Sequence, residues 1–184
     1  MLRLFSENAV AFGGYDPTVI TGFESYKSKD FEKLHKYFYA VMMHGDNDGV
    51  YVNGKWDVNQ FAPFLAHLHK KYGKGRAILL VSCWVGWKFA QPLAEKLQLP
   101  VVAGLSKVAF GKEFSGKTSK SYLAALDAQG IKLHDELTGQ KSKGKPFVAE
   151  WLFYHPTGQS EVIPGGKYLN QDEAVQRAKN YVRF

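Results

Sequence analysis

The stretch AILLVSC at residues 77–83 decides the fold class of this chain. Residues 77–81 are apolar on both faces of an extended backbone, which is typical of a central strand in a parallel sheet that is covered on both sides. A second run, YFYAVMM at residues 37–43, has the same character and ends at His44-Gly45. The sequence therefore predicts two buried strands, and each is followed directly by side chains capable of chemistry.

Helical patterns connect these strands. Asp57 and Gln60 have the spacing of a capping box, and apolar residues recur at helical intervals over 61–72. A second helical pattern covers 89–97, and the apolar residues 100–103 return as another strand. Strands that alternate with helices through short links predict an α/β fold with a mainly parallel central sheet, arranged as a three-layer αβα sandwich.

The two ends of the chain are less regular. Before the first buried strand we expect one strand within 2–12 and then a turn and loop, and after the last one a C-terminal β-hairpin and helix. The remaining expected elements are a helix from Asp30 to Lys36, a hairpin arm at 50–52, a hairpin near 108–114, a helix around 121–128 that Gly130 ends, a hairpin of 147–154 and 160–163, and a helix capped by Asn170 that runs to Val182.

Composition narrows the class of protein. A chain of 184 residues with 45% hydrophobic residues can bury a full core, and we expect a single domain over 1–184. No apolar run is long enough to span a bilayer, and the N-terminus lacks the apolar core of a secretory signal, so we expect a protein made in the cytoplasm with no membrane segment. The single cysteine excludes an internal disulfide.

Cys83 and His44 are the candidate catalytic residues. The carboxyl ends of the strands in an open α/β sheet converge on one crevice, where Cys83 can act as nucleophile and His44 as base. The N–H groups of Gly45 and Cys83 are candidate oxyanion donors. We also expect the start of the next helix to lie close to Cys83 and to favour its thiolate.

Weaker candidates surround this pair. Asp46 or Asp48 could orient His44, and Ser82 or Trp84 could line a substrate slot. His67 and His69 lie two residues apart on one helix and cannot share a face, so we interpret them as surface groups and expect no metal site. The pattern requires no cofactor.

The order of these features resembles the caspase- and gingipain-like (clan CD) cysteine peptidases, in which a strand ending in His-Gly precedes a helix and a strand ending in a nucleophilic Cys. Within that clan, residues 39–56 and 78–94 look most like domains at the toxic ends of bacterial polymorphic toxins and related secretion-system effectors. The resemblance covers residues 37–105. It departs from caspases after the cysteine, where Trp84 and Val85 precede Gly86.

The resemblance implies a caspase-like fold and a thiol-dependent hydrolase, a cysteine peptidase that acts on a protein or peptide as a bacterial toxin or effector. It also implies delivery into a target cell by a specialised secretion system, an immunity protein as partner, and an anionic regulator of the kind that related autoprocessing toxin peptidases use.

Other interpretations stay open. A lone cysteine after an apolar strand is often an inert core residue. Gly111–Thr118 matches the Walker A pattern for nucleotide phosphates. The net charge of +7 reflects a lysine-rich region at 107–145, which predicts either a solvated surface or a nucleotide- or anion-binding interaction protein without catalysis.

Overall fold

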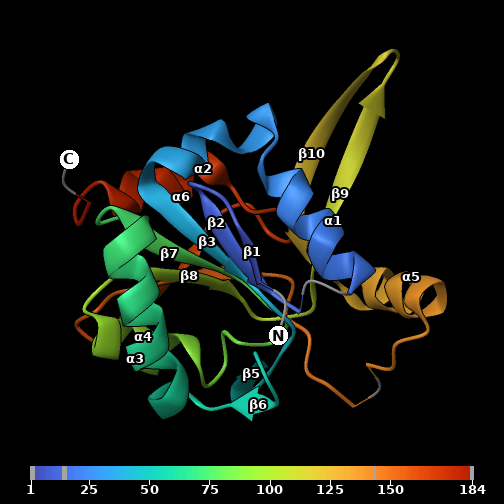
Figure 1. Cartoon of the computed structure of the whole chain (residues 1–184). Coiled ribbons are helices and arrows are strands. Elements are labelled where there is room, and N and C mark those ends of the chain that lie inside the picture. The colour runs from blue at the N-terminus through green and yellow to red at the C-terminus, as the bar shows by residue number, and fades with distance from the viewer. Residues whose placement is uncertain (1–2, 14–15, 143, 183–184) are drawn as a thin grey trace.

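A seven-stranded mixed sheet runs through the centre of the protein in a computed structural model that describes residues 3–13, 16–142 and 144–182 (Figure 1). The four inner strands β2, β3, β7 and β8 are parallel, whereas β1, β11 and β12 are antiparallel to their neighbours. The order across the sheet is β1 (Arg3–Phe5), β2 (Ala9–Phe12), β3 (Phe38–Met42), β7 (Ala77–Val81), β8 (Val101–Gly104), β11 (Trp151–Tyr154) and β12 (Ser160–Ile163).

The two apolar runs form the middle of this sheet, as the sequence predicted. Every residue of β3 and of β7 is buried, and the strands pair in parallel with Ala40 opposite Leu79. The α/β class with a mainly parallel sheet core is therefore confirmed, although both edges of the sheet are antiparallel. His44 and Cys83 follow the carboxyl ends of these adjacent strands.

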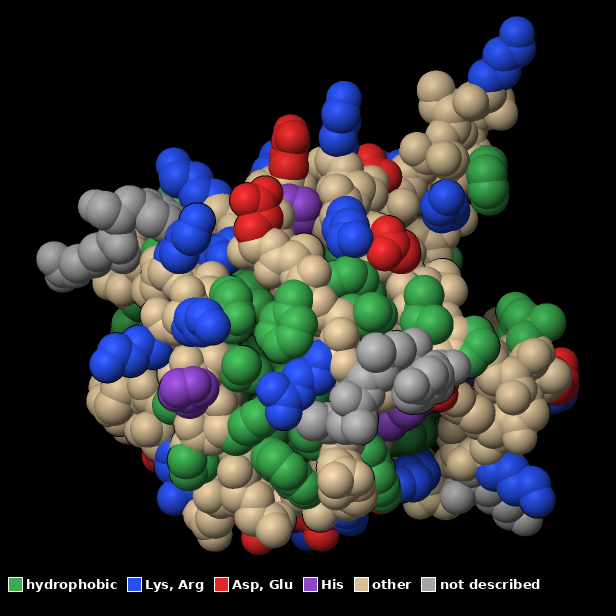
Figure 2. Space-filling model, viewed as in Figure 1, with side chains coloured by type: hydrophobic (Ala, Val, Ile, Leu, Met, Phe, Trp, Pro, Cys, Tyr) green, Lys and Arg blue, Asp and Glu red, His purple; other side chains and the backbone are tan. Residues whose placement is uncertain are grey.

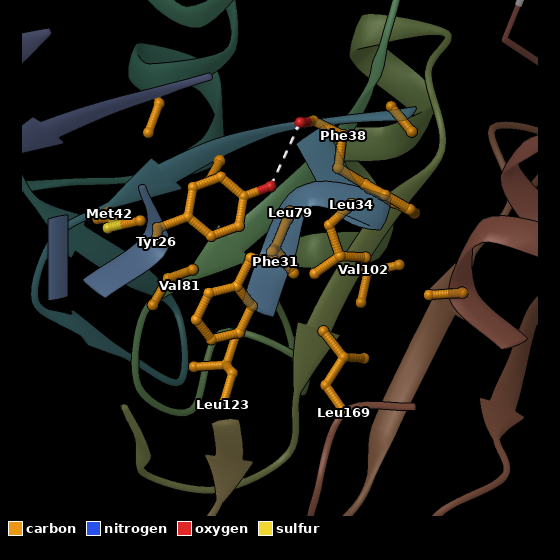
Figure 3. Close-up of a cluster of buried hydrophobic side chains, with 14 of the residues drawn as sticks. Tyr26, Phe31, Leu34, Phe38, Met42, Leu79, Val81, Val102, Leu123 and Leu169 are labelled. Carbon is orange, nitrogen blue, oxygen red and sulfur yellow. Dashed lines mark hydrogen bonds between the residues drawn. The ribbon is translucent and has the colours of Figure 1, made fainter. Parts of the chain in front are cut away.

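Helices cover both faces of the sheet. On one face lie α1 (Pro17–Tyr26), α2 (Glu32–Tyr37) and α6 (Gln171–Ala178), and on the other lie α3 (Val58–Leu68) and α4 (Ala90–Leu97). Figure 3 shows the first of these cores, where Tyr26, Phe31 and Leu34 pack against the strands and the Tyr26 hydroxyl donates to the Phe38 carbonyl over 3.4 Å. These layers fix the ends of α1, β3 and β7 relative to one another.

The start of α3 follows the predicted capping box. The Gln60 N–H donates to Asp57 Oδ1 and the Asp57 N–H donates to Gln60 Oε1, each over 2.9 Å. The helix continues into a five-residue π-helical turn, His69–Gly73, where His69 is buried and its Nε2 lies 2.7 Å from the Arg76 carbonyl oxygen. The prediction that His69 lies on the surface was therefore wrong.

The N-terminal region differs from its prediction. The expected single strand is a hairpin of β1 and β2, and the expected loop after it contains α1, which Asp16 caps and Pro17 begins. The Gly13 to Pro17 segment has turn composition, but it is also a helix start, because Asp is a good N-cap and Pro is tolerated in the first turn. Only residues 14–15 of this segment lie outside the described residues.

The helix expected around 121–128 is also wrong. Residues 118–125 form β10 (Thr118–Ala125), which pairs along its whole length with β9 (Val108–Ser115) in a hairpin that projects from the body of the protein (Figure 1). Gly130 does not end a helix but lies in the first turn of α5 (Ala128–Thr138), where its N–H donates to the Asp127 cap. Cross-strand pairing outweighed a helical pattern of only two turns.

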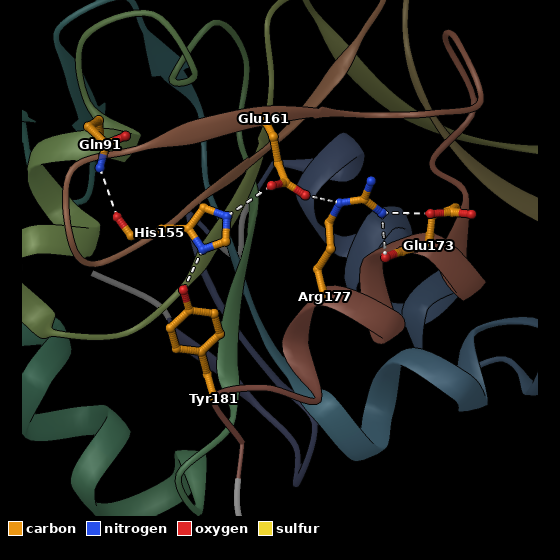
Figure 4. Close-up of polar contacts among 6 residues, drawn as sticks. All are labelled: Gln91, His155, Glu161, Glu173, Arg177 and Tyr181. Atoms are coloured by element: carbon orange, nitrogen blue, oxygen red, sulfur yellow. Dashed lines mark hydrogen bonds and ion pairs between the residues drawn. The ribbon is translucent and has the colours of Figure 1, made fainter.

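The C-terminal hairpin and helix are confirmed. Strands β11 and β12 extend the central sheet, and Asn170 caps α6, which ends at Ala178 and not at Val182. Figure 4 shows how this region is held: Glu161 on β12 accepts from His155 and from Arg177, and Arg177 also donates to Glu173 over 2.7 Å. These ion pairs fasten α6 to the edge of the sheet.

Smaller strands complete the fold. After His44 the chain forms a three-stranded sheet of β4 (Gly45–Asp46), β5 (Gly49–Tyr51) and β6 (Lys55–Trp56), which includes the expected hairpin arm. A 3-10 turn, Lys29–Phe31, precedes α2 where a single helix was expected. No helix within the described part of the chain has both the length and the apolar character needed to cross a membrane.

Candidate functional site

A hydrogen bond to a carboxylate fixes the orientation of His44. Its Nε2 lies 2.6 Å from Asp16 Oδ2, while Asp16 Oδ1 accepts hydrogen bonds from Thr18 N and Thr18 Oγ1 over 2.8 and 2.7 Å. Burial raises the pKa of Asp16, but the hydrogen bonds from Thr18 and His44 outweigh burial and lower it to about 2. One carboxylate therefore caps α1 and holds the imidazole.

This contact decides which imidazole nitrogen is available. A carboxylate that is ionised at neutral pH can only accept a hydrogen bond, so the proton in the contact belongs to His44 Nε2. In the neutral imidazole the second nitrogen, Nδ1, is then the acceptor. The side chain of His44 is 41% exposed.

Cys83 lies just beyond the end of β7, where it is half-buried and unbonded to any other sulfur. Its Sγ lies 4.0 Å from the Val108 carbonyl oxygen. Burial raises the pKa of the Cys83 thiol, and the hydrogen bond to Val108 and the charge of Lys107 offset this only in part. Cys83 is therefore a thiol, not a thiolate, at neutral pH.

The expected helix N-terminus beside Cys83 is missing, so that prediction was wrong. Turns follow the cysteine, and α4 begins only at Ala90. Trp84 has φ of 59°, a left-handed conformation that is unusual for a residue other than glycine. The backbone N–H of Trp84 donates to the Ser106 carbonyl over 3.1 Å and holds this sharp turn. The turn directs the chain away from β7 immediately after Cys83.

A cavity of about 300 Å³ brings the two candidate catalytic residues together, because both His44 and Cys83 line it. Its walls come from the first turns of α1, from the ends of β3 and β7, and from the start of β9. The other lining residues that bear on its chemistry are Thr18, Gly22, Met42, Met43, Val81, Ser82, Lys107, Val108, Ala109, Phe110, His134 and Gln140.

Gly45 lies in close contact with the turn that carries Cys83. A Cβ at Gly45 would lie 2.8 Å from the Cys83 carbonyl oxygen and closer still to Ser82 Oγ, so any side chain would push the two loops apart. The φ angle of Gly45 is not in the left-handed region, so its own conformation does not require glycine. The close approach of the two loops does.

The backbone N–H of Gly45 remains outside the local β-ladder. Tyr51 N donates to the His44 carbonyl over 2.9 Å, which makes Gly45 and Val50 the next, non-hydrogen-bonded pair of this antiparallel ladder. The Cys83 N–H likewise has no hydrogen-bond acceptor within the described residues. Gly45 itself is not among the residues that line the cavity.

Buried polar groups line the cavity as well. Ser82 is only 1% exposed, and neither its Oγ nor His134 Nδ1 has a hydrogen-bond partner among the described residues. Burial and the charge of Lys107 both lower the pKa of His134. Lys107 itself is 3% exposed and donates to Asp135 Oδ1 over 2.8 Å and to Ser142 Oγ over 3.3 Å.

Three of the four remaining sequence candidates lie elsewhere. Asp46 pairs with Lys145 over 2.5 Å and Asp48 pairs with Lys55 over 2.6 Å, so neither contacts His44. Trp84 is not part of the cavity wall: its indole N–H donates to the Pro146 carbonyl over 2.5 Å. Ser82 does line the cavity. Asp16, which the sequence analysis missed, is the carboxylate beside His44.

The Walker A pattern has a different structure from a phosphate-binding loop. Gly111–Thr118 spans the end of β9, a tight turn and the start of β10, whereas a phosphate-binding loop leads from a strand into a helix N-terminus. The lysine-rich region is divided among the hairpin, α5 and the segment after it, and Lys107 is buried. Figure 2 shows Lys and Arg side chains scattered over the face of the protein seen in that view and at the hairpin tip, not gathered in one patch.

Metal ligation is not indicated by the described side chains, among which no three His, Cys, Asp or Glu residues are grouped closely enough to hold an ion. The arrangement of thiol, imidazole and carboxylate has the composition of a nucleophilic site instead.

Comparison with known proteins supplies a family. A family model described as a domain of unknown function (DUF8616) matches residues 16–120, more than half of the chain, and this range includes Asp16, His44 and Cys83. The comparisons with curated proteins and with solved structures give no significant match.

Proposed function

The chain belongs to the DUF8616 family, whose function is unknown, and we propose that it is a thiol-dependent hydrolase, a cysteine peptidase with a caspase-like three-layer α/β fold. One observation carries this proposal: Cys83 and His44 line the same cavity, and Asp16 holds the imidazole of His44. A nucleophile, a base and a carboxylate that orients the base are the three parts of a catalytic triad.

Because the pKa of Cys83 is raised, His44 must accept the proton of the thiol. The thiol is protonated before reaction, so its proton passes to His44 Nδ1 as the sulfur attacks. The imidazolium that forms is stabilised by the ionised carboxylate of Asp16 at Nε2. The helix cap keeps that carboxylate in place, because Thr18 binds its other oxygen.

The acyl-transfer step is then as follows. Cys83 Sγ forms a bond to the carbonyl carbon of an amide, and the carbonyl electron pair moves to the oxygen, where the N–H groups of Gly45 and Cys83 donate to it. The intermediate expels the amine, which takes the proton from His44. Water, deprotonated by His44, hydrolyses the thioester and returns the thiol.

The resemblance to bacterial toxin domains extends the proposal to a biological role. The protein would be an effector that is made in the cytoplasm, passes through a specialised secretion system and cleaves a protein or peptide in the target cell. Its producer would then carry an immunity protein. These parts rest on the resemblance of residues 37–105 alone.

A peptide-cleavage assay tests the core of the proposal. A fluorogenic peptide library is incubated with the wild-type chain and with the variants Cys83→Ala and His44→Ala, and circular dichroism verifies that each variant is folded. We expect loss of cleavage in both variants. His67→Ala is the matched control, because His67 is an exposed histidine of α3 outside the cavity. Full cleavage by folded Cys83→Ala contradicts the proposal.

A further inference from the structure

The walls of the cavity are mainly apolar. Met42 and Val81 come from the ends of the central strands, and Val108, Ala109 and Phe110 come from the start of β9. Gly22, in the middle of α1, also lines the cavity. A group that enters this space loses water and gains contact with hydrocarbon, which favours an apolar group.

The cavity offers no free charge to a ligand. Lys107 is the only Lys, Arg, Asp or Glu among the described lining residues, and Asp135 already neutralises it. The lowered pKa of His134 keeps that imidazole neutral at neutral pH. A charged side chain would therefore be desolvated here without an opposite charge to compensate it.

Two contacts set the size of the space. A Cβ at Gly22 would lie 3.2 Å from the ring of Phe110, so the ring lies directly against the glycine backbone. Phe110 also packs edge-on against Phe31, with the ring centroids 5.5 Å apart, and cannot withdraw freely. Glycine costs stability inside a helix, and its presence in α1 leaves room for the Phe110 ring. The resulting cavity of about 300 Å³ suits one large side chain.

A buried polar group lies beside the cavity at the Cys83 end. Ser82 Oγ is fully buried and unpartnered within the described part of the chain, and it lies against Gly45 at the Cys83 end. Because this oxygen faces the Gly45 backbone and is closed to solvent, it is not offered to a group inside the cavity, and the apolar walls set the preference.

Resting on the proposed acyl transfer at Cys83, we infer that this cavity is the specificity pocket for the side chain on the acyl side of the cleaved bond, and that it selects a large uncharged side chain. Phenylalanine, leucine and methionine fit its apolar walls. Aspartate, glutamate, lysine and arginine are excluded because no counter-charge is free.

Peptidyl acyloxymethyl ketones that differ only in that side chain test the inference on the intact protein. Second-order rates of Cys83 modification, with the site verified by mass spectrometry, are compared for Phe, Leu, Met, Ala, Asp and Arg probes. We expect the Phe, Leu and Met probes to react at least about tenfold faster than the Asp and Arg probes, as one unsatisfied buried charge requires. Equal or faster reaction of the Asp or Arg probe overturns the inference.

Two variants with opposite effects on the cavity sharpen the test. Gly22→Ala presses on the Phe110 ring and should lower the Phe-to-Ala rate ratio severalfold, whereas Phe110→Ala enlarges the space and should favour a naphthylalanine probe over Phe. Ile20→Ala is the matched control on α1, since Ile20 does not line the cavity. Unchanged ratios in both folded variants mean that another surface selects the substrate.

The same experiment separates failure of the inference from failure of the proposed function. If no probe modifies Cys83 faster than it modifies free glutathione, the catalytic proposal fails. The pocket is then tested by reversible binding of N-acetyl-phenylalanine amide and N-acetyl-arginine amide to the Cys83→Ala variant, followed by NMR. Preference for the phenylalanine compound with shifts at cavity residues supports the pocket, and no preference overturns it.

Discussion

Replacement of Asp16 by asparagine separates the two roles of this side chain. Asparagine is as good an N-cap as aspartate, so Oδ1 of the variant can still accept from Thr18 N, and α1 keeps its first turn. The group that faces His44 changes from an acceptor-only carboxylate to an amide. If its NH₂ turns toward Nε2, that nitrogen must become an acceptor, which moves the proton to Nδ1.

The expected magnitudes follow from these contacts. A His44 with its proton on Nδ1 cannot take the Cys83 proton, and loss of a general base lowers the rate by about 10²–10⁴-fold. The shift of the Asp16 pKa from 3.8 to about 2 corresponds to roughly 2.5 kcal/mol of interaction before screening. Because the side chain is 35% exposed, solvent reduces this to about 1–2 kcal/mol of stability.

The assay measures kcat/KM for the best library peptide and the free energy of unfolding in urea for the same samples. Asp127→Asn is the matched control, because Asp127 caps α5 through the same kind of contact, to Gly130 N over 2.8 Å, and has no histidine partner. Asp16→Asn activity above about a tenth of wild type, in a folded protein, would refute the orienting role of Asp16.

Three further predictions concern stability and close packing. The folded-state pKa of Asp16 lies below its unfolded value, so the stability that its carboxylate contributes is full above pH 3.8 and is lost as the pH falls toward 2. Urea titrations at falling pH should therefore show that the wild-type protein loses about 1–2 kcal/mol of stability, a loss that Asp16→Asn lacks. Gly45→Ala should destabilise the protein by about 1–3 kcal/mol and abolish cleavage, because the added Cβ would lie 2.8 Å from the Cys83 carbonyl oxygen. A variant that unfolds at the same urea concentration as the wild type would show that the two loops do not approach this closely. Lys107→Met leaves Asp135 without its charged partner, with only the hydrogen bonds from Ser142, and should cost about 2–4 kcal/mol. Lys107→Met combined with Asp135→Leu should recover part of that loss, and no recovery would show that the pair is not coupled.

The centre of the fold was predictable because local pattern and tertiary environment agree there. Residues 77–81 are apolar without alternation, and only a strand buried on both faces satisfies that pattern, so β7 begins and ends where the sequence indicated. Residues 118–125 show the opposite case. A short helix was expected over 121–128, but 121–125 belong to β10, where pairing with 108–112 of β9 across a two-residue turn prevails over the local pattern.

The same distinction applies to the site. The placement of His44, Gly45 and Cys83 after adjacent strands was predictable, because the carboxyl ends of parallel strands converge on one edge of the sheet. Asp16 was not predictable, because its partner lies on another element and its local sequence describes only a turn or a helix cap. A helix N-cap aspartate that precedes the buried strands is the signal that could have suggested it.

The missing helix N-terminus beside Cys83 changes how its reactivity must be measured. A thiolate stabilised in the resting state would react with small alkylating agents faster than a free thiol does. Burial raises the pKa of Cys83 instead, so we expect iodoacetamide to modify it more slowly than glutathione at neutral pH. A peptidyl probe that fills the cavity places a carbonyl near Gly45 N–H and brings His44 into the reaction. Slow modification by iodoacetamide together with fast, His44-dependent modification by such a probe distinguishes a nucleophile from an inert core cysteine, whereas slow reaction with both identifies a structural residue.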